Sequence, residues 1–384
     1  RKTGAEVRDC YLMTSVREKA ATVRATGDGR AAALRVVVAD YADPGRVVKT
    51  AGPLPAAAAA GGGWSLETAF PWPDARLWSL DHPNLYTYHV EALDAGGAVL
   101  DRTFPVRFGF RELWIQEGRF MLNNRPVTLN MDIHTPLASR VSNVGRFADA
   151  EGWREVVRQW KRLGINTAVH RWSALVDDSA LYRVADEEGF FISTDIFGFQ
   201  YGMPEANRLP EIQEYKEKLN VYRLLVRRHC PSLAFYYLPG TANTWDFEPG
   251  KLGEDYDTEA MFGRHNRPER AFVGAFDPAR VAFAGSGGGK DEPVHSSMNY
   301  IHIDADLQVH ETWPSHWYTR QTKPLALYEM SAPPYIADWY LRRDRGEQAH
   351  GRKGNLPFWL EVSAITFGEE PYLREPRPAV SNWL

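Results

Sequence analysis

An apolar run in the last sixth of the sequence ends at an acidic side chain. Residues 323–330 read Lys-Pro-Leu-Ala-Leu-Tyr-Glu-Met, and the breaker-rich segment 331–334 follows directly. This pattern predicts a strand that leaves a core and presents Glu329 near its carboxyl end. A (β/α)8 barrel supplies catalytic groups in this way. Glu329 is therefore the first candidate for a catalytic carboxylate.

A second strand-like run, residues 233–238, ends without a carboxylate. It continues into Gly240, Thr241, Ala242 and Asn243. The nearest acidic side chains downstream belong to Asp246 and Glu248. Of the two, Asp246 is closer to the strand end and follows Trp245, whose apolar face could raise the carboxyl pKa. Solvated loop charges are the plainer interpretation of both residues.

The elements that must position these residues fall into two groups. Residues 1–111 predict an all-β domain, because strand-like runs such as 35–39 and 86–93 recur about every ten residues without a helical period. A hairpin turn at 94–97 leads into the strand at 98–100. The alanine- and glycine-rich segment 56–63 predicts a loop between strands.

From residue 112 to 384, predicted strands alternate with predicted helices, which indicates parallel βα units. Eight strands over roughly 270 residues match the size of a (β/α)8 TIM barrel. The fold class is therefore predicted as a β-sandwich at 1–111 followed by a barrel at 112–384. The predicted helices are 149–163, 179–188 and 215–228. The predicted strands are 127–131, 165–169, 190–194, 233–238, 280–284, 300–303, 323–330 and 358–362.

Composition excludes several classes of function. The net charge of -4, with no block of Lys or Arg, gives no field that would attract nucleic acid. No run reaches the ~18 apolar residues of a membrane span. Two cysteines far apart in sequence, Cys10 and Cys230, predict neither a disulfide framework nor a thiolate metal site. The 13 Trp, 17 Tyr and 18 Phe either fill a large core or stack on sugar rings.

Several motifs, taken together in order and spacing, resemble those of glycoside hydrolase family 2, which includes β-galactosidases, β-glucuronidases and β-mannosidases. Residues 78–86, WSLDHPNLY, resemble the family's W-S-P-E-x-P-x-L-Y, and residues 108–111, FGFR, its F-G-F-R junction. Residues 120–127 resemble F-x-L-N-G-x-P-V, with Asn124 where glycine is usual. Residues 164–167, 185–189 and 228–232 resemble the family's G-x-N, C-D-E-x-G and R-x-x-H-P-S, the last with Cys230 inserted.

The resemblance implies an immunoglobulin-like sandwich before the barrel and a retaining glycosidase. In a retaining glycosidase one carboxyl attacks the sugar and a second protonates the leaving oxygen. Glu329 matches the nucleophile, whereas Ala242 stands where the acid/base Glu is expected and Thr241 replaces the preceding Asn. The family's amino-terminal jelly-roll domain is missing and the sequence starts at Arg1, which indicates a fragment or processed form.

Three explanations of Ala242 follow. The protein is a catalytically silent relative that still binds sugar, it uses a displaced acid at Asp246 or Glu248, or the residue was substituted to trap a complex. An active enzyme would act on the end of a β-linked oligo- or polysaccharide.

Further substrate-binding candidates lie at predicted strand ends and in nearby aromatic loops. Arg171 is shifted by two residues from the family's arginine, and a structural role is an equally plain interpretation of a histidine at a strand end. These candidates are His134, Arg171, Trp172, Asp195, Asn243, Trp245, His302, Trp313 and Trp317.

No cofactor and no metal are predicted. His302, Asp304, Asp306 and His310 fit no established metal-ligand spacing and predict a polar loop. The expected partner is a saccharide, with no nucleic acid and no membrane. The oligomeric state stays open. A periplasmic or secreted location would suit a polysaccharide substrate, and a cytoplasmic one is compatible as well.

Overall fold

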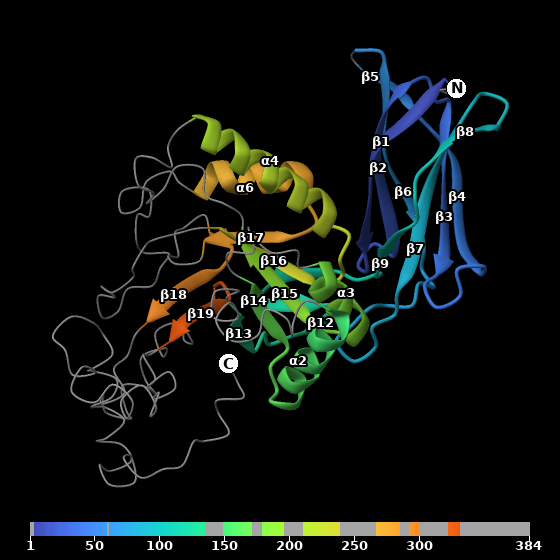
Figure 1. Ribbon diagram of the computed structural model, residues 1–384. Helices are drawn as coiled ribbons and strands as arrows, with labels where there is room; N and C mark the ends of the chain where they lie inside the picture. Colours follow the sequence, from blue (N-terminus) through green and yellow to red (C-terminus); the bar gives the residue numbers. More distant parts are fainter. Residues whose placement is uncertain are drawn as a thin grey trace, which may run out of the picture. The chain divides into compact units, whose positions relative to one another are not determined.

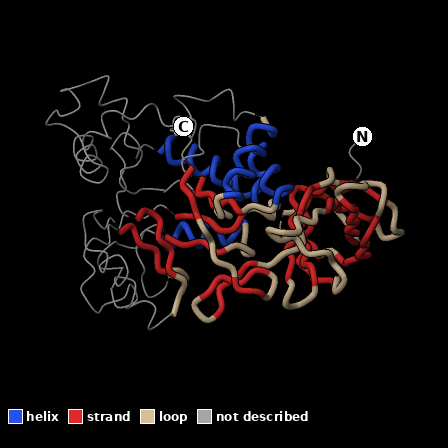
Figure 2. The backbone as a smooth tube through the Cα atoms, turned by 90° about the horizontal axis from the view of Figure 1, so that it is seen from below, coloured by secondary structure: helices blue, strands red, loops and turns tan. Residues whose placement is uncertain are grey.

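The computed structural model describes residues 4–59, 61–134, 149–170, 179–195, 210–238, 266–284, 292–299 and 322–330. They belong to two compact units. The first contains all described residues up to Leu238 and those from 266 to 283, and the second contains a short strand pair. Most of the described regular structure is β-sheet (Figures 1 and 2).

Two antiparallel sheets form the amino-terminal part of the first unit, in strand orders β1-β2-β6-β5 and β4-β3-β7-β8, with β9 paired to β7. Among the described residues from 4 to 134, which are all of that range except residue 60, there is no α-helix (Figure 2). The strands are β1 (Ala5–Ser15), β2 (Ala20–Gly29), β3 (Ala33–Asp40), β4 (Val47–Pro55), β5 (Ala57–Ala59), β6 (Gly63–Pro71), β7 (Tyr86–Leu93), β8 (Val99–Arg102) and β9 (Val106–Phe108).

One hydrophobic core lies between these two sheets. In β3, Leu34, Val36 and Val38 are fully buried at every second position, as expected for a strand with one face on a core. They share that core with side chains of the other sheet, such as Val23 and Trp64. The predicted strands at 35–39 and 86–93 and the hairpin after them are confirmed, and the Gly97 amide donates to the Asp94 carbonyl at 3.1 Å.

The prediction of a loop over residues 56–63 was wrong. Ala57–Ala59 forms β5, which pairs antiparallel with the start of β6 so that Ala58 lies opposite Trp64. A strand at a sheet edge needs backbone hydrogen bonds more than bulky side chains. The alanine-rich composition therefore concealed the pairing.

A small three-stranded antiparallel sheet follows the two-sheet part, which is residues 5–108, and links it to the rest of the unit. It consists of β10 (Leu113–Gln116), β11 (Arg119–Leu122) and β12 (Arg125–Pro126). Asn123 and Asn124 form its second turn with φ of 52° and 65°. Asparagine tolerates this left-handed region better than most residues, and glycine tolerates it best. Asn124 can therefore take the position where family members have glycine.

The strand predicted at 127–131 lies further along the chain, because β13 spans Met131–His134. The parallel pairing is set by Asn130, whose carbonyl accepts hydrogen bonds from the amides of Asn166 and Thr167 at 3.0 and 3.1 Å. The Asn130 amide in turn donates to Asn166 Oδ1 at 2.9 Å. Polar side chains rather than an apolar run therefore determine where this strand begins.

A five-stranded sheet, in the order β13-β14-β15-β16-β17, forms the other half of the first unit. The described pairs β13–β14, β14–β15 and β15–β16 are parallel. Helices flank the sheet, with α2 packed on α3 and α6 packed on α4 and β16 (Figure 1). The strands are β14 (Thr167–His170), β15 (Phe191–Asp195), β16 (Leu233–Leu238) and β17 (Val281–Ala284). The helices are α2 (Ala150–Arg162), α3 (Ser179–Glu188), α4 (Pro210–Arg227) and α6 (Asn266–Phe276).

The first predicted helix is confirmed together with its ends. Asp149 caps α2, because its side chain accepts a hydrogen bond from the Gly152 amide at 2.8 Å. Trp153, Val157 and Trp160 are buried on one face of that helix. Gly164 follows with a φ of 78°, the conformation that commonly ends a helix.

The helix predicted at 179–188 and the strand predicted at 233–238 are confirmed with both ends, and the strands predicted at 165–169, 190–194 and 280–284 are confirmed with ends shifted by one or two residues. The helix predicted at 215–228 starts five residues earlier, at Pro210, because proline suits the first turn of a helix. Helix α6 was not predicted. The strands predicted at 300–303 and 358–362 lie outside the described residues.

The second unit contains one described pair of parallel strands, β18 (His295–Asn299) and β19 (Leu325–Met330). The strand predicted to carry Glu329 is thus confirmed, and β18 was not predicted. The described strands do not test closure into an eight-stranded barrel, and the domain boundary after residue 111 stays a prediction. None of the described helices has the length and apolar character needed to cross a membrane.

Candidate active site

The carboxyl ends of neighbouring parallel strands bring two of the predicted site residues to one edge of the five-stranded sheet. His134 is the last residue of β13 and lies opposite His170, the last residue of β14. His170 pairs with Thr194, and Asp195 then ends β15 opposite Tyr237 of β16. Paired strands lie about 4.8 Å apart, so His134 and Asp195 are two strands from each other at this edge.

Glu329 is the fifth of the six residues of β19, which pairs in parallel with β18. Its Cα lies opposite that of Met298, just after a shift in the register of the pair. Upstream in β19, Ala326 is buried. The candidate nucleophile therefore stands near the carboxyl end of a parallel strand, as the sequence predicts.

The other predicted site residues lie outside the described part of the chain, so their positions are not tested. These residues are Arg171, Trp172, Asn243, Trp245, Asp246, Glu248, His302, Trp313 and Trp317, together with Ala242.

Strand β16, which leads toward residues 240–243, is held from outside the sheet at two levels. At its start, Arg111 Nε donates to the Pro231 carbonyl at 2.8 Å, and Arg280 Nε donates to the Leu233 carbonyl at 3.0 Å. Further along, the Tyr236 hydroxyl donates to Asp277 Oδ2 at 2.9 Å. The second oxygen of Asp277 accepts from the hydroxyl of Tyr11, a residue of β1, at 2.7 Å.

The hydroxyls of Tyr11 and Tyr236 both donate hydrogen bonds to the Asp277 carboxylate. Burial, followed by the nearby Asp277 carboxylate, raises the pKa of Tyr11, and the same two causes raise the pKa of Tyr236. Both hydroxyls therefore stay protonated near neutral pH. The Arg280 guanidinium lies 3.4 Å from the Tyr11 hydroxyl and supplies a positive charge beside the carboxylate.

Asp186 joins α3 to both neighbouring parts of the unit. Its side chain accepts hydrogen bonds from Arg107 at 2.6 and 3.0 Å and from the Ser232 amide at 3.0 Å. Its backbone carbonyl accepts a hydrogen bond from the Trp78 indole at 2.8 Å. Burial raises the pKa of the Asp186 carboxyl, while the Arg107 charge opposes that rise.

Residues from the family-like motifs thus meet where the two-sheet part joins the parallel sheet. Trp78, Arg111, Asp186 and Ser232 all contribute to this junction through the contacts above. Gly109 packs there too, because an added Cβ would come within 2.7 Å of Trp78 Cβ and 2.9 Å of Pro231 Cβ. The motifs that carry the resemblance are therefore structural at these positions.

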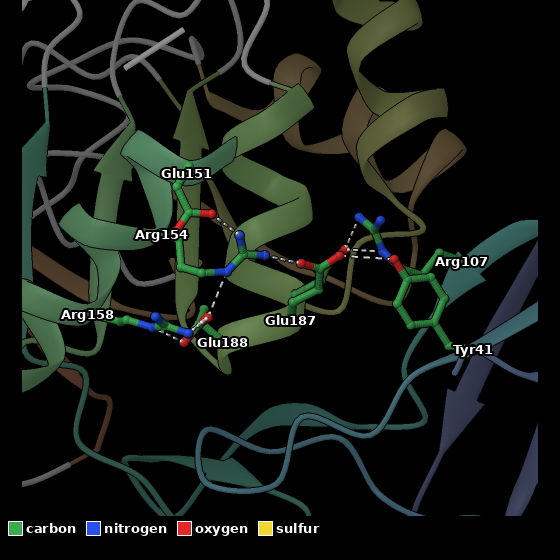
Figure 3. Close-up of polar contacts among 8 residues, drawn as sticks. Tyr41, Arg107, Glu151, Arg154, Arg158, Glu187 and Glu188 are labelled. Carbon is green, nitrogen blue, oxygen red and sulfur yellow. Dashed lines mark hydrogen bonds and ion pairs between the residues drawn. The ribbon is translucent and has the colours of Figure 1, made fainter. Parts of the chain in front are cut away.

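A second group of polar contacts in this region involves exposed and half-buried charges (Figure 3). Arg154 of α2 forms ion pairs with Glu187 at 2.6 Å and with Glu188 at 3.0 Å, and Arg158 pairs with Glu188 at 2.9 Å. The Tyr41 hydroxyl, from the loop after β3, donates to Glu187 Oε1 at 2.9 Å. These contacts tie α2, α3 and the loop together. Glu187 and Glu188 lie in the motif at residues 185–189, but the sequence predicted none of these contacts.

The described residues contain neither a cluster of metal-ligand side chains nor a thiol with a lowered pKa. In that part of the chain, no group of three or more His, Cys, Asp or Glu side chains is placed to hold a metal ion. Cys10 and Cys230 are both free, and burial raises the pKa of each thiol. Neither is therefore poised as a nucleophile.

Comparison with known proteins adds to this geometry. Residues 5–111 match the family described as Glycosyl hydrolases family 2. A β-galactosidase of Vibrio vulnificus is 26% identical over 278 residues, which cover 67% of this chain and 23% of that protein. The predicted resemblance to glycoside hydrolase family 2 is confirmed by these two matches. The chain spans about a quarter of the length of that β-galactosidase.

Solved structures share the fold at low identity. A β-glucuronidase from Parabacteroides merdae is similar with a TM-score of 0.55 and 18% identity, covering 84% of this chain and 39% of its own. A β-galacturonidase from Eisenbergiella tayi gives a TM-score of 0.59 and 15% identity, covering 86% of this chain and 57% of its own.

Proposed function

We propose that this protein is a family 2 glycoside hydrolase that acts on a β-linked sugar with retention of configuration. Glu329 is the nucleophile in this proposal. The observation that carries it is the parallel pairing of β19 with β18, which sets Glu329 near the carboxyl end of a parallel strand. Barrel enzymes build their active sites from residues at such ends.

The proposed architecture follows the same relationship. Residues 1–111 form an immunoglobulin-like sandwich, and residues 112–384 form a TIM barrel whose carboxyl-terminal edge holds the sugar. His134 and Asp195, both at strand ends, are proposed to contact the substrate. So are Arg171, Trp172, Asn243, Trp245, His302, Trp313 and Trp317. The relatives' names suggest a β-galactoside, β-glucuronide or β-galacturonide as the first substrates to test.

Because Ala242 stands at the acid/base position, we predict that turnover depends on the leaving group of the substrate. A methyl side chain cannot protonate a leaving oxygen, and general acid catalysis contributes about 10²–10⁴-fold. A 2,4-dinitrophenolate leaves without protonation, so its β-glycosides should be cleaved, whereas the matching methyl glycosides should react about 10²–10⁴-fold more slowly. Azide attacks the glycosyl-enzyme without a general base and should therefore accelerate turnover and yield a β-glycosyl azide.

The experiment measures release of dinitrophenol from the three β-glycosides, with and without azide. Glu329→Gln should abolish it, and Glu217→Gln, which alters an exposed carboxylate of α4, should not. If Asp246 or Glu248 is a displaced acid, methyl glycosides are also cleaved and Asp246→Asn or Glu248→Gln removes that cleavage. An unchanged rate in Glu329→Gln contradicts the proposed nucleophile.

The second candidate function is a catalytically silent carbohydrate-binding protein, and Ala242 is the residue that favours it. This candidate predicts saturable sugar binding by calorimetry without turnover of any dinitrophenyl glycoside. That result would overturn the enzymatic proposal and leave the sugar site intact.

A further inference from the structure

Strand β16 has an irregularity in its pairing with β15 that decides which way its tyrosines face. Strand β15 advances two residues from Ile192 to Thr194. Over the same stretch β16 advances three residues, from Leu233 to Tyr236. Leu233 and Tyr236 consequently both belong to the buried cluster that packs against the helices, although residues three apart in a regular strand face opposite sides. Irregularities of this kind re-aim side chains and are frequent next to active sites.

Both strands are anchored on the helix side directly after this irregularity. Thr194 and Tyr236 are Cα partners in β15 and β16. The Thr194 hydroxyl accepts a hydrogen bond from Arg227 Nη1 of α4 at 2.8 Å. The Tyr236 hydroxyl donates to Asp277 Oδ2 at 2.9 Å. All four residues are buried, so these hydrogen bonds to charged groups are costly to break and hold the register of the two strands.

Tyr237 therefore lies on the face of the sheet that points away from the helices, because successive residues of a strand alternate between faces. Phe235 lies on that face too, since its ring contacts those of Phe120 in β11 and Phe283 in β17, with centroids 6.3 and 4.8 Å apart. The Cα of Tyr237 lies opposite that of Asp195. Without the extra residue in β16, Tyr236 would take this place.

Ser193 brings a second hydroxyl group to the same face. Its neighbours in β15 both face the helices, because Ile192 belongs to the helix-facing cluster and Thr194 contacts Arg227. Ser193 is fully buried, and its Oγ forms no hydrogen bond within the described part of the chain. This face of the sheet is thus aromatic at Phe235 and carries hydroxyl groups within two residues of the carboxyl ends of β15 and β16.

We propose that Tyr237 is a specificity-determining residue of the sugar site, and that its hydroxyl forms a hydrogen bond with one ring hydroxyl of the bound glycoside. Barrel enzymes bind their substrates at the carboxyl ends of the strands, and Tyr237 is one residue from the end of β16. Its Cα partner Asp195 is a substrate contact in the proposed function. Tyr237 is 6% exposed, whereas the helix-facing Tyr236 is 1% exposed.

The chemistry of the side chain suits a neutral sugar ring. A phenol offers an apolar ring and a hydroxyl that both donates and accepts. A site built to hydrogen-bond a substrate hydroxyl discriminates against analogues that lack it. The inference rests on the proposed function for its effect on turnover, whereas sugar binding tests it separately.

Tyr237→Phe and a set of deoxy substrates test the inference together. The substrates are 2,4-dinitrophenyl β-glycosides that each lack one ring hydroxyl. In the wild type, loss of the contacted hydroxyl should lower kcat/KM about 10-fold. Tyr237→Phe should lower kcat/KM for the complete substrate by the same factor. In this variant the analogue without the contacted hydroxyl should lose nothing more, because the interaction is already absent.

Tyr236→Phe is the matched control, because it removes the same group from the neighbouring residue on the opposite face. This variant should have a lower Tm, since Asp277 loses a buried donor. Any change in its kcat/KM should be the same factor for the complete substrate and for every deoxy analogue.

The inference is overturned if every deoxy analogue loses the same factor in Tyr237→Phe as in the wild type, or if Tyr236→Phe gives the pattern expected of Tyr237→Phe. If the wild type cleaves no glycoside, the proposed function fails, and calorimetric titration with the free sugars of the three glycosides decides instead. Binding that is about 10-fold weaker in Tyr237→Phe, with the wild-type affinity kept in Tyr236→Phe, supports the contact. Equal affinities in the wild type and Tyr237→Phe, or no sugar binding by the wild type, overturn it.

Discussion

Asp186 illustrates how a motif residue can serve the fold rather than the reaction. It lies within residues 185–189, one of the segments that resemble family 2, and it is fully buried. Its carboxylate pairs with Arg107, and its carbonyl accepts from Trp78 of another motif. At these positions the family-like motifs therefore stabilise the junction between the two-sheet part and the parallel sheet. This explains how a chain can resemble the family clearly while Ala242 departs from it at the predicted acid/base position.

Replacing Asp186 should destabilise the protein strongly. Asp186→Asn removes the buried charge that pairs with Arg107, and breaking a buried pair in this way costs about 3–5 kcal/mol. Glu187→Gln is the control, because its pair with Arg154 is partly exposed and is worth about 1 kcal/mol or less. Urea unfolding of both variants measures the difference. Equal losses in the two variants would contradict the role assigned to Asp186.

At the scale of the elements, the close approach of residues 108–111 to Trp78 and Pro231 depends on the absence of a side chain at Gly109. Gly109→Ala would place a methyl group within 3 Å of two ring carbons, and overpacking of this kind costs about 1–3 kcal/mol. The Tm should fall accordingly.

Gly274 provides the matching substitution, because a Cβ built there meets nothing within 4 Å and the residue lies inside α6. Gly274→Ala should raise stability by up to about 1 kcal/mol, since alanine favours a helix more than glycine does. Calorimetric melting of the two variants should therefore show shifts of opposite sign. A loss of stability in Gly274→Ala, or none in Gly109→Ala, would contradict this account of the packing.

The elements also show how far the sequence alone can lead. Helix α2 was predictable with both ends, because its apolar period, its Asp149 cap and Gly164 all agree. Strand β5 was not, because alanine carries no signal for an edge strand. Strand β13 begins at a position set by the side-chain contacts of Asn130 and Asn166, which no local pattern reveals.

In the candidate site, too, some residues were predictable from the sequence and others were not. Glu329 was predictable as a residue of a strand, because an apolar run and a breaker bracket it. The network of Tyr11, Tyr236 and Asp277 was not, since its members lie up to 266 positions apart in sequence. Contacts of this kind depend on how whole elements pack, and each of the three residues looks ordinary in its local sequence.

At the scale of the whole molecule, the junction between the two-sheet part and the parallel sheet contains a half-buried histidine that should make stability depend on pH. His229 contacts Tyr88 and Tyr11, with 3.3 Å between the Tyr88 hydroxyl and its Nδ1. Burial, followed by the charges of Arg228 and Arg280, lowers its pKa from 6.5 to about 3. The folded protein therefore holds this ring neutral through mildly acidic conditions.

The direction in which stability changes with pH follows from the protons bound at His229 in the folded and unfolded chains. Below pH 6.5 the unfolded chain binds a proton at His229, and the folded chain does not until the pH approaches about 3. Stability is therefore fully present above pH 6.5 and falls as the pH drops, by up to about 1.4 kcal/mol per pH unit from this residue. His229→Gln should show a shallower loss between pH 6 and 4 in urea unfolding. Parallel pH profiles for the two proteins would contradict the assignment.

The central claim, that Glu329 attacks the sugar, is tested most directly by trapping the glycosyl-enzyme. A 2-deoxy-2-fluoro β-glycoside with a 2,4-dinitrophenolate leaving group destabilises the oxocarbenium-like transition states, so the covalent intermediate should accumulate. Peptide mass spectrometry should find one fluoroglycosyl group per chain, on the peptide that contains Glu329, and none in Glu329→Gln. An adduct on a different residue, or turnover of dinitrophenyl glycosides without any adduct at Glu329, would contradict the account.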